Sequence, residues 1–146
     1  MRERGGLLAK EADFQRATKH PLFPEYFDFR EEKGRGVLMM EYVPGESLDV
    51  ILRREGAFSD RQAAGIGCRL AEGLSYLHEG KIPLVFRDVK PSNVMLTPEG
   101  GVKLLDFGCV CHAGRNADIA GTPEFGAPEQ FVQSGQQTAV TDIYAL

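Results

Sequence analysis

Four polar residues in the middle of the chain have side chains that could act together on a phosphate group. Asp88, Lys90 and Asn93 lie within one short polar stretch, and Asp106 follows a later apolar run. Carboxylate and amide oxygens are ligands that Mg²⁺ accepts in proteins. A lysine ammonium group can neutralise a phosphate oxygen. This set of side chains predicts a site for Mg²⁺ and a phosphate.

The residues between Asn93 and Asp106 have the pattern of a β-hairpin. Residues 94–96 are apolar, a Pro and Gly turn covers 98–101, and residues 102–105 form a second mainly apolar run. Such a pattern predicts two short antiparallel strands. The hairpin would bring Asn93 and Asp106 together at one end, so it is the element that must position both metal ligands.

The other elements are predicted from periodicity and from capping residues. Residues 7–19 favour a helix that ends near Pro21, and 26–30 and 37–42 favour strands joined by a charged turn at 31–36. A short helix is expected over 46–54, before a glycine. Ser59 and Gln62 form a capping box for a helix that runs to residue 80. Its apolar stripe predicts a face in the core.

The amino-acid sequence of these segments resembles that of the protein kinase family. The chain reads R-D-V-K-P-S-N at 87–93 and D-F-G at 106–108, followed by G-T-P at 121–123 and A-P-E at 127–129. The lysine two places after the aspartate is similar to serine/threonine kinases. The run G-T-P-E-F-G-A-P-E-Q is similar to the bacterial kinases of eukaryotic type.

The resemblance implies an α+β, two-lobed fold of which this chain is a part. Residues 1–43 would be an N-lobe remnant with helix αC, two strands and the hinge. Residues 44–146 would be the C-lobe with the catalytic loop and activation segment, as far as the start of helix αF. The family's glycine-rich loop and β3 lysine would lie upstream of Met1. We therefore expect the chain alone to be inactive.

The resemblance also implies roles for the site residues, with ATP and Mg²⁺ as cofactors and Ser or Thr hydroxyls of proteins as acceptors. Asp88 would accept the proton of the hydroxyl, and Lys90 would contact the γ-phosphate and so bind ATP. Asn93 and Asp106 would hold Mg²⁺. Residues facing adenine would be the backbone of Glu41 and Val43 and the side chain of Met95.

Further residues would have structural or regulatory roles in the family. Glu11 would be the αC glutamate, Met40 the gatekeeper, and Arg87 the arginine that binds a phosphorylated loop. Phe107 would be the aromatic residue of D-F-G, and Thr122 the threonine near the catalytic aspartate. Glu129 would be the A-P-E glutamate, and Asp142 the αF aspartate that accepts hydrogen bonds from the catalytic loop.

The chain departs from the family pattern at three places. Phe86 replaces the usual histidine, although its ring could still pack on Phe107. Gln15 occupies a position where the family has an apolar residue. Residues 109–119 contain no Ser, Thr or Tyr, so Arg87 would have no phosphate partner there.

Composition limits the remaining classes. A net charge of -4 gives no basic surface for nucleic acid, and we expect no such partner. Three cysteines without a framework spacing favour free thiols in a reducing compartment, hence the cytoplasm. No segment is apolar enough to predict a membrane span. Cys109, Cys111 and His112 offer three metal donors without a fourth, which favours ordinary thiols over zinc.

Two other functions stay open. The chain could be a pseudokinase or binding module that uses the fold without catalysis, in keeping with the expected lack of the glycine-rich loop. Intact Asp88, Lys90, Asn93 and Asp106 argue against this interpretation. A small-molecule phosphotransferase would share these residues, but it would not need the A-P-E segment that shapes a peptide-binding surface.

Overall fold

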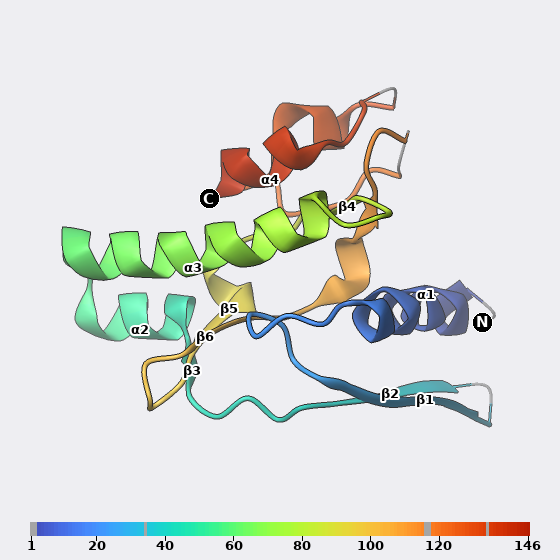
Figure 1. Ribbon diagram of the computed structural model, residues 1–146, viewed down its shortest axis with the longest axis horizontal. Coiled ribbons are helices and arrows are strands. Elements are labelled where there is room, and N and C mark those ends of the chain that lie inside the picture. The colour runs from blue at the N-terminus through green and yellow to red at the C-terminus, as the bar shows by residue number, and fades with distance from the viewer. Residues whose placement is uncertain (1–2, 34, 116–117, 134) are drawn as a thin grey trace.

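The computed structural model describes residues 3–33, 35–115, 118–133 and 135–146 (Figure 1). The helices are α1 (Glu3–Ala17), α2 (Leu48–Glu55), α3 (Asp60–His78) and α4 (Ala139–Ala145). The strands are β1 (Tyr26–Glu32), β2 (Arg35–Met40), β3 (Glu46–Ser47), β4 (Leu84–Val85), β5 (Val94–Leu96), β6 (Val102–Leu104) and β7 (Cys111–His112). Helices and small antiparallel sheets mix along the chain, which confirms the α+β class. None of the described helices is long and apolar enough to cross a bilayer.

Helix α1 lies beside the hairpin of β1 and β2 (Figure 1). Both strands extend into the charged segment expected to be a turn, and β2 ends at Met40 although the predicted strand ran to residue 42. Glu32 pairs with Arg35, so the connection is tighter than predicted. The charged side chains here are exposed to solvent, and a strand can therefore carry them without burying charge. Gly34 lies outside the described residues.

The capping box predicted for α3 is confirmed. The backbone N–H of Gln62 donates to Ser59 Oγ at 3.4 Å, and the backbone N–H of Ser59 donates to Gln62 Oε1 at 3.1 Å. Leu70, Leu74 and Leu77 form the buried part of the predicted stripe. The helix ends at His78, somewhat before the predicted end.

The start predicted for the short helix is wrong. Glu46 and Ser47 form strand β3, which pairs with β5 through Glu46–Leu96 and Ser47–Met95. Helix α2 then begins at Leu48. A backbone partner on the edge of the β5–β6 hairpin competes successfully with the helical propensity of these two residues.

The β5–β6 hairpin forms as predicted and its register is fixed at both ends. The backbone N–H of Thr97 donates to the Gly101 carbonyl at 2.9 Å in the turn. At the other end, the N–H of Leu105 donates to the Asn93 carbonyl at 2.8 Å. Asn93 and the residue before Asp106 are therefore direct neighbours.

Three phenylalanine rings join the elements that carry the site. Phe86 and Phe107 meet edge to face with centroids 5.6 Å apart, which confirms the packing predicted for Phe86. Phe23 meets Phe107 at 5.2 Å and Phe86 at 6.2 Å. These rings are nearly inaccessible to solvent and lie in one core cluster with Leu74 and Leu104. The core therefore fixes Phe86, two residues before Asp88, and Phe107, directly after Asp106.

The segment after α1 packs closely on α3 because of a glycine. A Cβ atom at Gly73 would lie 2.1 Å from Cδ2 of Leu22, a distance that no side chain tolerates. The Leu22 carbonyl in turn accepts a hydrogen bond of 2.8 Å from the N–H of Leu104 on β6. The close contact with α3 thus helps to place the hairpin that adjoins Asn93 and Asp106, the predicted metal ligands.

We predict that Gly73→Ala destabilises the protein although alanine favours helices. Overpacking against Leu22 should lower the free energy of unfolding by about 1–3 kcal/mol. The matched control is Gly65→Ala in the same helix, where a Cβ meets nothing within 4 Å. That change should raise stability by about 0.5–1 kcal/mol. Denaturant titration measures both, and equal effects at the two positions would contradict the prediction.

Candidate active site

The loop between β4 and β5 is bound by a buried carboxyl group on α4. Asp142 is 0% exposed, and its Oδ2 and Oδ1 accept hydrogen bonds from the backbone N–H groups of Phe86 at 2.8 Å and Arg87 at 2.7 Å. His78 Nε2 lies 2.7 Å from Oδ2. The two backbone hydrogen bonds are those that the resemblance implied for Asp142, whereas the contact with His78 was not predicted. They fix the backbone directly before Asp88.

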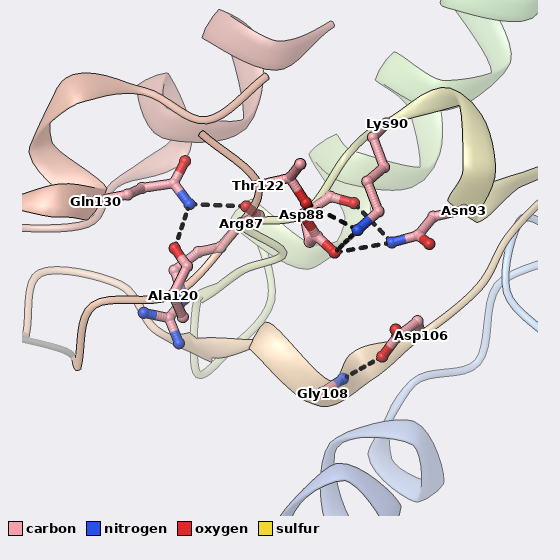
Figure 2. A network of polar contacts seen from close by, with 9 residues as sticks. All are labelled: Arg87, Asp88, Lys90, Asn93, Asp106, Gly108, Ala120, Thr122 and Gln130. Atoms are coloured by element: carbon pink, nitrogen blue, oxygen red, sulfur yellow. Dashed lines mark hydrogen bonds and ion pairs between the residues drawn. The ribbon is translucent and has the colours of Figure 1, made fainter. Parts of the chain in front are cut away.

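Asp88, Lys90 and Thr122 form one polar cluster (Figure 2). Lys90 Nζ lies 2.7 Å from Asp88 Oδ2 and 2.8 Å from Thr122 Oγ1. The Thr122 hydroxyl donates to Asp88 Oδ1 at 2.7 Å. Asn93 Nδ2 donates to the Asp88 carbonyl and to Oδ2, both at 3.0 Å. The Asp88 carboxylate is therefore oriented by three different side chains.

Asn93 and Asp106 offer oxygen atoms that suit a hard cation. The amide nitrogen of Asn93 is used by Asp88, which leaves Oδ1 as the ligand atom. Asp106 Oδ1 accepts a hydrogen bond of 3.0 Å from the Gly108 N–H, and Oδ2 accepts none from the described residues. One amide oxygen and one carboxylate fit Mg²⁺, which takes few protein ligands and keeps waters or phosphate oxygens.

A strained backbone separates Asp106 from its neighbour Phe107. Asp106 has φ of 75°, in the left-handed region, and its side chain is exposed while Phe107 is 1% exposed. The carboxyl group of Glu11 on α1 lies near both residues. Burial raises the pKa of Glu11 above its usual value, the charge of Asp106 raises it further, and the backbone N–H of Phe107 acts in the opposite direction. Among the described residues Glu11 has no ion-pair partner.

The guanidinium group of Arg87 donates hydrogen bonds to two backbone carbonyl groups of the segment expected to be the activation segment. Arg87 Nε donates to the Cys109 carbonyl, and Nη1 donates to the Asp118 carbonyl at 2.8 Å. The residue is 7% exposed and has φ of 70°. These carbonyls satisfy two of the N–H donors of the guanidinium group. The sequence predicted only that a phosphate partner would be lacking.

The segment expected to face adenine is joined to the hairpin by an ion pair. Glu41 Oε2 lies 2.7 Å from Lys103 Nζ and accepts the Glu25 N–H at 3.0 Å. The Lys103 ammonium holds the pKa of Glu41 below its usual value. Lys103 pairs across the sheet with Met95, and Val43 is buried. The structure thus brings the predicted hinge and the predicted adenine floor to one side of the hairpin.

Two further predicted residues, Met40 and Glu129, each contact a side chain from another element. Met40 accepts a weak contact of 3.6 Å from Gln15 Nε2, which also donates to the Pro24 carbonyl at 3.3 Å. Gln15 is buried, so a polar group fills the position expected to be apolar. Glu129 Oε1 accepts the Thr141 hydroxyl at 2.7 Å.

The cysteine segment differs from the predicted loop. Residues 107–109 form a single 3₁₀ turn, and Cys111 and His112 form β7, which pairs with β4. Burial raises the pKa of the Cys109 and Cys111 thiols above the usual value. In the part of the chain that the structure describes, no three His, Cys, Asp or Glu side chains are grouped so as to hold a metal.

Three polar residues of the site were missed by the sequence analysis: Gln130, Lys103 and Thr141. Gln130 is buried and bonds both Arg87 and Ala120 (Figure 2). Its position directly after A-P-E was the one available signal. Lys103 and Thr141 lie in ordinary strand and helix patterns, and nothing local distinguishes them from exposed polar residues.

Comparison with known proteins shows which family the chain resembles. The family model described as protein kinase domain matches residues 2–146. A cAMP-dependent protein kinase, catalytic subunit-like, from Caenorhabditis briggsae is 33% identical over 129 residues, which cover 88% of this chain and 33% of that protein. The serine/threonine-protein kinase PknA of Corynebacterium glutamicum is 39% identical over 114 residues, or 75% of this chain and 24% of that protein.

A third relative is mitogen-activated protein kinase kinase kinase 19 of Homo sapiens, 35% identical over 149 residues that cover 95% of this chain and 11% of that protein. The chain spans about a third or less of the length of these curated relatives. The family model matches nearly all of the chain, from residue 2 to residue 146, and we conclude that this chain belongs to the protein kinase family.

Proposed function

We propose that the chain carries the catalytic loop and activation segment of a serine/threonine protein kinase, which transfers the γ-phosphoryl group of ATP to Ser or Thr hydroxyls of proteins. The observation that carries the proposal is the hydroxyl of Thr122 between Asp88 Oδ1 and Lys90 Nζ, at 2.7 and 2.8 Å. A carboxylate and an ammonium group placed around a hydroxyl suit phosphoryl transfer to an alcohol.

In this reaction the substrate oxygen forms a bond to the γ-phosphorus, and the bond from that phosphorus to the β–γ bridging oxygen breaks. Asp88 takes the proton of the hydroxyl as the bond forms. Because Asp88 is 6% exposed and receives hydrogen bonds from Asn93, its carboxylate keeps one orientation without rearrangement. Lys90 places its charge beside the same centre, where it can offset charge on the phosphate oxygens.

Asn93 Oδ1 and Asp106 Oδ2 would hold Mg²⁺. When bound, the ion supplies charge neutralisation on the phosphate oxygens. The protein contributes fixed positions for the two oxygens: Asn93 is held by Asp88, and Asp106 by the N–H of Gly108. We also propose that residues 1–43 and 44–146 are parts of two lobes. Glu41, Val43 and Met95 would then contact adenine between them.

The metal assignment predicts unequal effects of two substitutions in the full-length protein, by which we mean a protein that carries these residues within a complete kinase domain, since we expect the 146-residue chain alone to be inactive. Asp106→Asn should lower kcat by about 10³-fold or more, because it removes the negative ligand. Asn93→Ala should leave activity that rises with Mg²⁺ concentration. Asp13→Asn, an exposed aspartate of α1, is the control for loss of one carboxylate.

Steady-state kinetics over a range of Mg²⁺ concentrations measures kcat of both variants and its dependence on the metal. Equal and mild effects of the two substitutions would contradict the metal assignment. Wild-type protein that binds Mg-ATP without turnover would favour the pseudokinase, and transfer to small alcohols but to no protein would favour the small-molecule phosphotransferase.

Activity is predicted not to depend on phosphorylation of the activation segment. Arg87 already bonds the carbonyls of Cys109 and Asp118. A phosphate on Thr122 would place about two negative charges beside Asp88. Treatment with a phosphatase should leave kcat unchanged, with phosphate occupancy followed by mass spectrometry. Activation that follows phosphate on Thr122 would overturn this prediction.

The raised pKa of Glu11 predicts how stability changes with pH. A carboxyl group whose pKa is higher in the folded state binds more protons there, so stability falls as pH rises from its unfolded toward its folded pKa. In the 146-residue chain, Glu11→Gln should therefore raise the melting temperature at pH 7 and have little effect in acid.

Thermal unfolding as a function of pH measures this difference. Glu99→Gln, in the exposed turn between β5 and β6, is the control for loss of one negative charge. A lower melting temperature of Glu11→Gln at pH 7 would show that Glu11 has a stabilising partner.

A further inference from the structure

The side-chain amide of Gln130 connects three segments next to the candidate active site (Figure 2). Gln130 Nε2 donates to the carbonyls of Arg87 at 2.7 Å and Ala120 at 2.9 Å, and Oε1 accepts the N–H of Ala127 at 2.9 Å. The side chain is 1% exposed. Both N–H groups of the amide and its oxygen are used, so this buried polar group is satisfied.

The two carbonyls bonded by Nε2 lie shortly before Asp88 and Thr122, on the two sides of the candidate site. Arg87 is followed by Asp88, and Ala120 is followed by Gly121 and Thr122. One NH₂ group therefore sets the separation between the catalytic loop and the activation segment. The hydrogen bond from the Thr122 hydroxyl to Asp88 joins the same two segments.

Gly121 shows how closely the activation segment passes over this amide. It has φ of 115°, a conformation that favours glycine. A Cβ atom here would lie 2.4 Å from Gln130 Nε2 and 2.9 Å from the Arg87 carbonyl oxygen. No larger residue fits while the two hydrogen bonds of Gln130 are kept.

We propose that Gln130 is a positioning residue: its amide holds the activation segment on the catalytic loop, so that Thr122 stays between Asp88 and Lys90 without a phosphate group. Asp142 accepts a hydrogen bond from the backbone N–H of Arg87, and Gln130 donates one to its carbonyl. The guanidinium group of Arg87 donates to the activation segment, at the carbonyl of Asp118. Loss of the amide leaves the buried carbonyl of Arg87 and the partly buried carbonyl of Ala120 without this donor, which favours opening of the segment. The effect on catalysis rests on the proposed function, whereas the positional effect does not.

Gln137 provides a matched control. It is also 1% exposed, and its Nε2 donates to the carbonyls of Glu129 at 3.0 Å and Gly135 at 3.3 Å. Among the described residues its amide makes no hydrogen bond to the catalytic loop or to residues 118–126. Substitution of Gln137 therefore removes an equally buried amide outside the junction.

The test compares Gln130→Met with Gln137→Met in the full-length protein by amide hydrogen exchange. Gln130→Met should accelerate exchange of the peptide covering residues 118–126 by about tenfold, because local opening becomes easier. Gln137→Met should leave this peptide within about twofold of wild type. Equal acceleration in both variants, or none in Gln130→Met, would overturn the proposal.

Two further measurements keep the test decisive. If Gln130→Met does not fold, Gly121→Ala displaces the segment from the other side and should accelerate the same peptide. In kinase assays, Gln130→Met should lower kcat/KM for a protein substrate about tenfold while KM for ATP changes less than about twofold. An equal rise of KM for ATP would indicate general loosening and contradict a positioning role. Wild-type protein without activity would refute the proposed function and leave the exchange result to decide on Gln130.

Discussion

A fully buried carboxyl group, that of Asp142, is the constraint on which the site depends. Removing such a group from water is costly unless donors replace its hydration. The donors available are the N–H groups of Phe86 and Arg87 and the ring of His78, all of which lie 55 to 64 residues before Asp142 in the sequence. Satisfying Asp142 therefore requires α3, α4 and the catalytic loop to meet in one arrangement, and this arrangement leaves Asp88 at the surface of the core.

The backbone is strained at two residues of the candidate site. Arg87 and Asp106 both have positive φ angles although neither is glycine, and each immediately adjoins a functional position or is one. Such conformations cost free energy and persist only where surrounding contacts over-determine them. At Arg87 these contacts are hydrogen bonds on the backbone and the guanidinium group. At Asp106 they are the burial of Phe107 and the hydrogen bond from Gly108.

Local patterns sufficed to predict much of this structure. The capping box at Ser59, the β5–β6 hairpin and the packing of Phe86 on Phe107 follow from signals within a few residues or from the family wording. Strand β3 could not be predicted, because its partner β5 lies far along the chain and overrides helical propensity. The Glu41–Lys103 pair depends in the same way on a tertiary contact that no local pattern encodes.

The pairing of β4 with β7 has a consequence for how this region can vary. Leu84 pairs with His112, so the catalytic loop and the activation segment leave the same two-stranded ribbon. The activation segment is bound again at Gly114 by the carbonyl of Gln137, and at Ala120 by Gln130. A loop fastened at several points loses little further entropy when its free stretches change length. A change of length between these points therefore need not shift the register of Asp88, Lys90 and Thr122 in the candidate site.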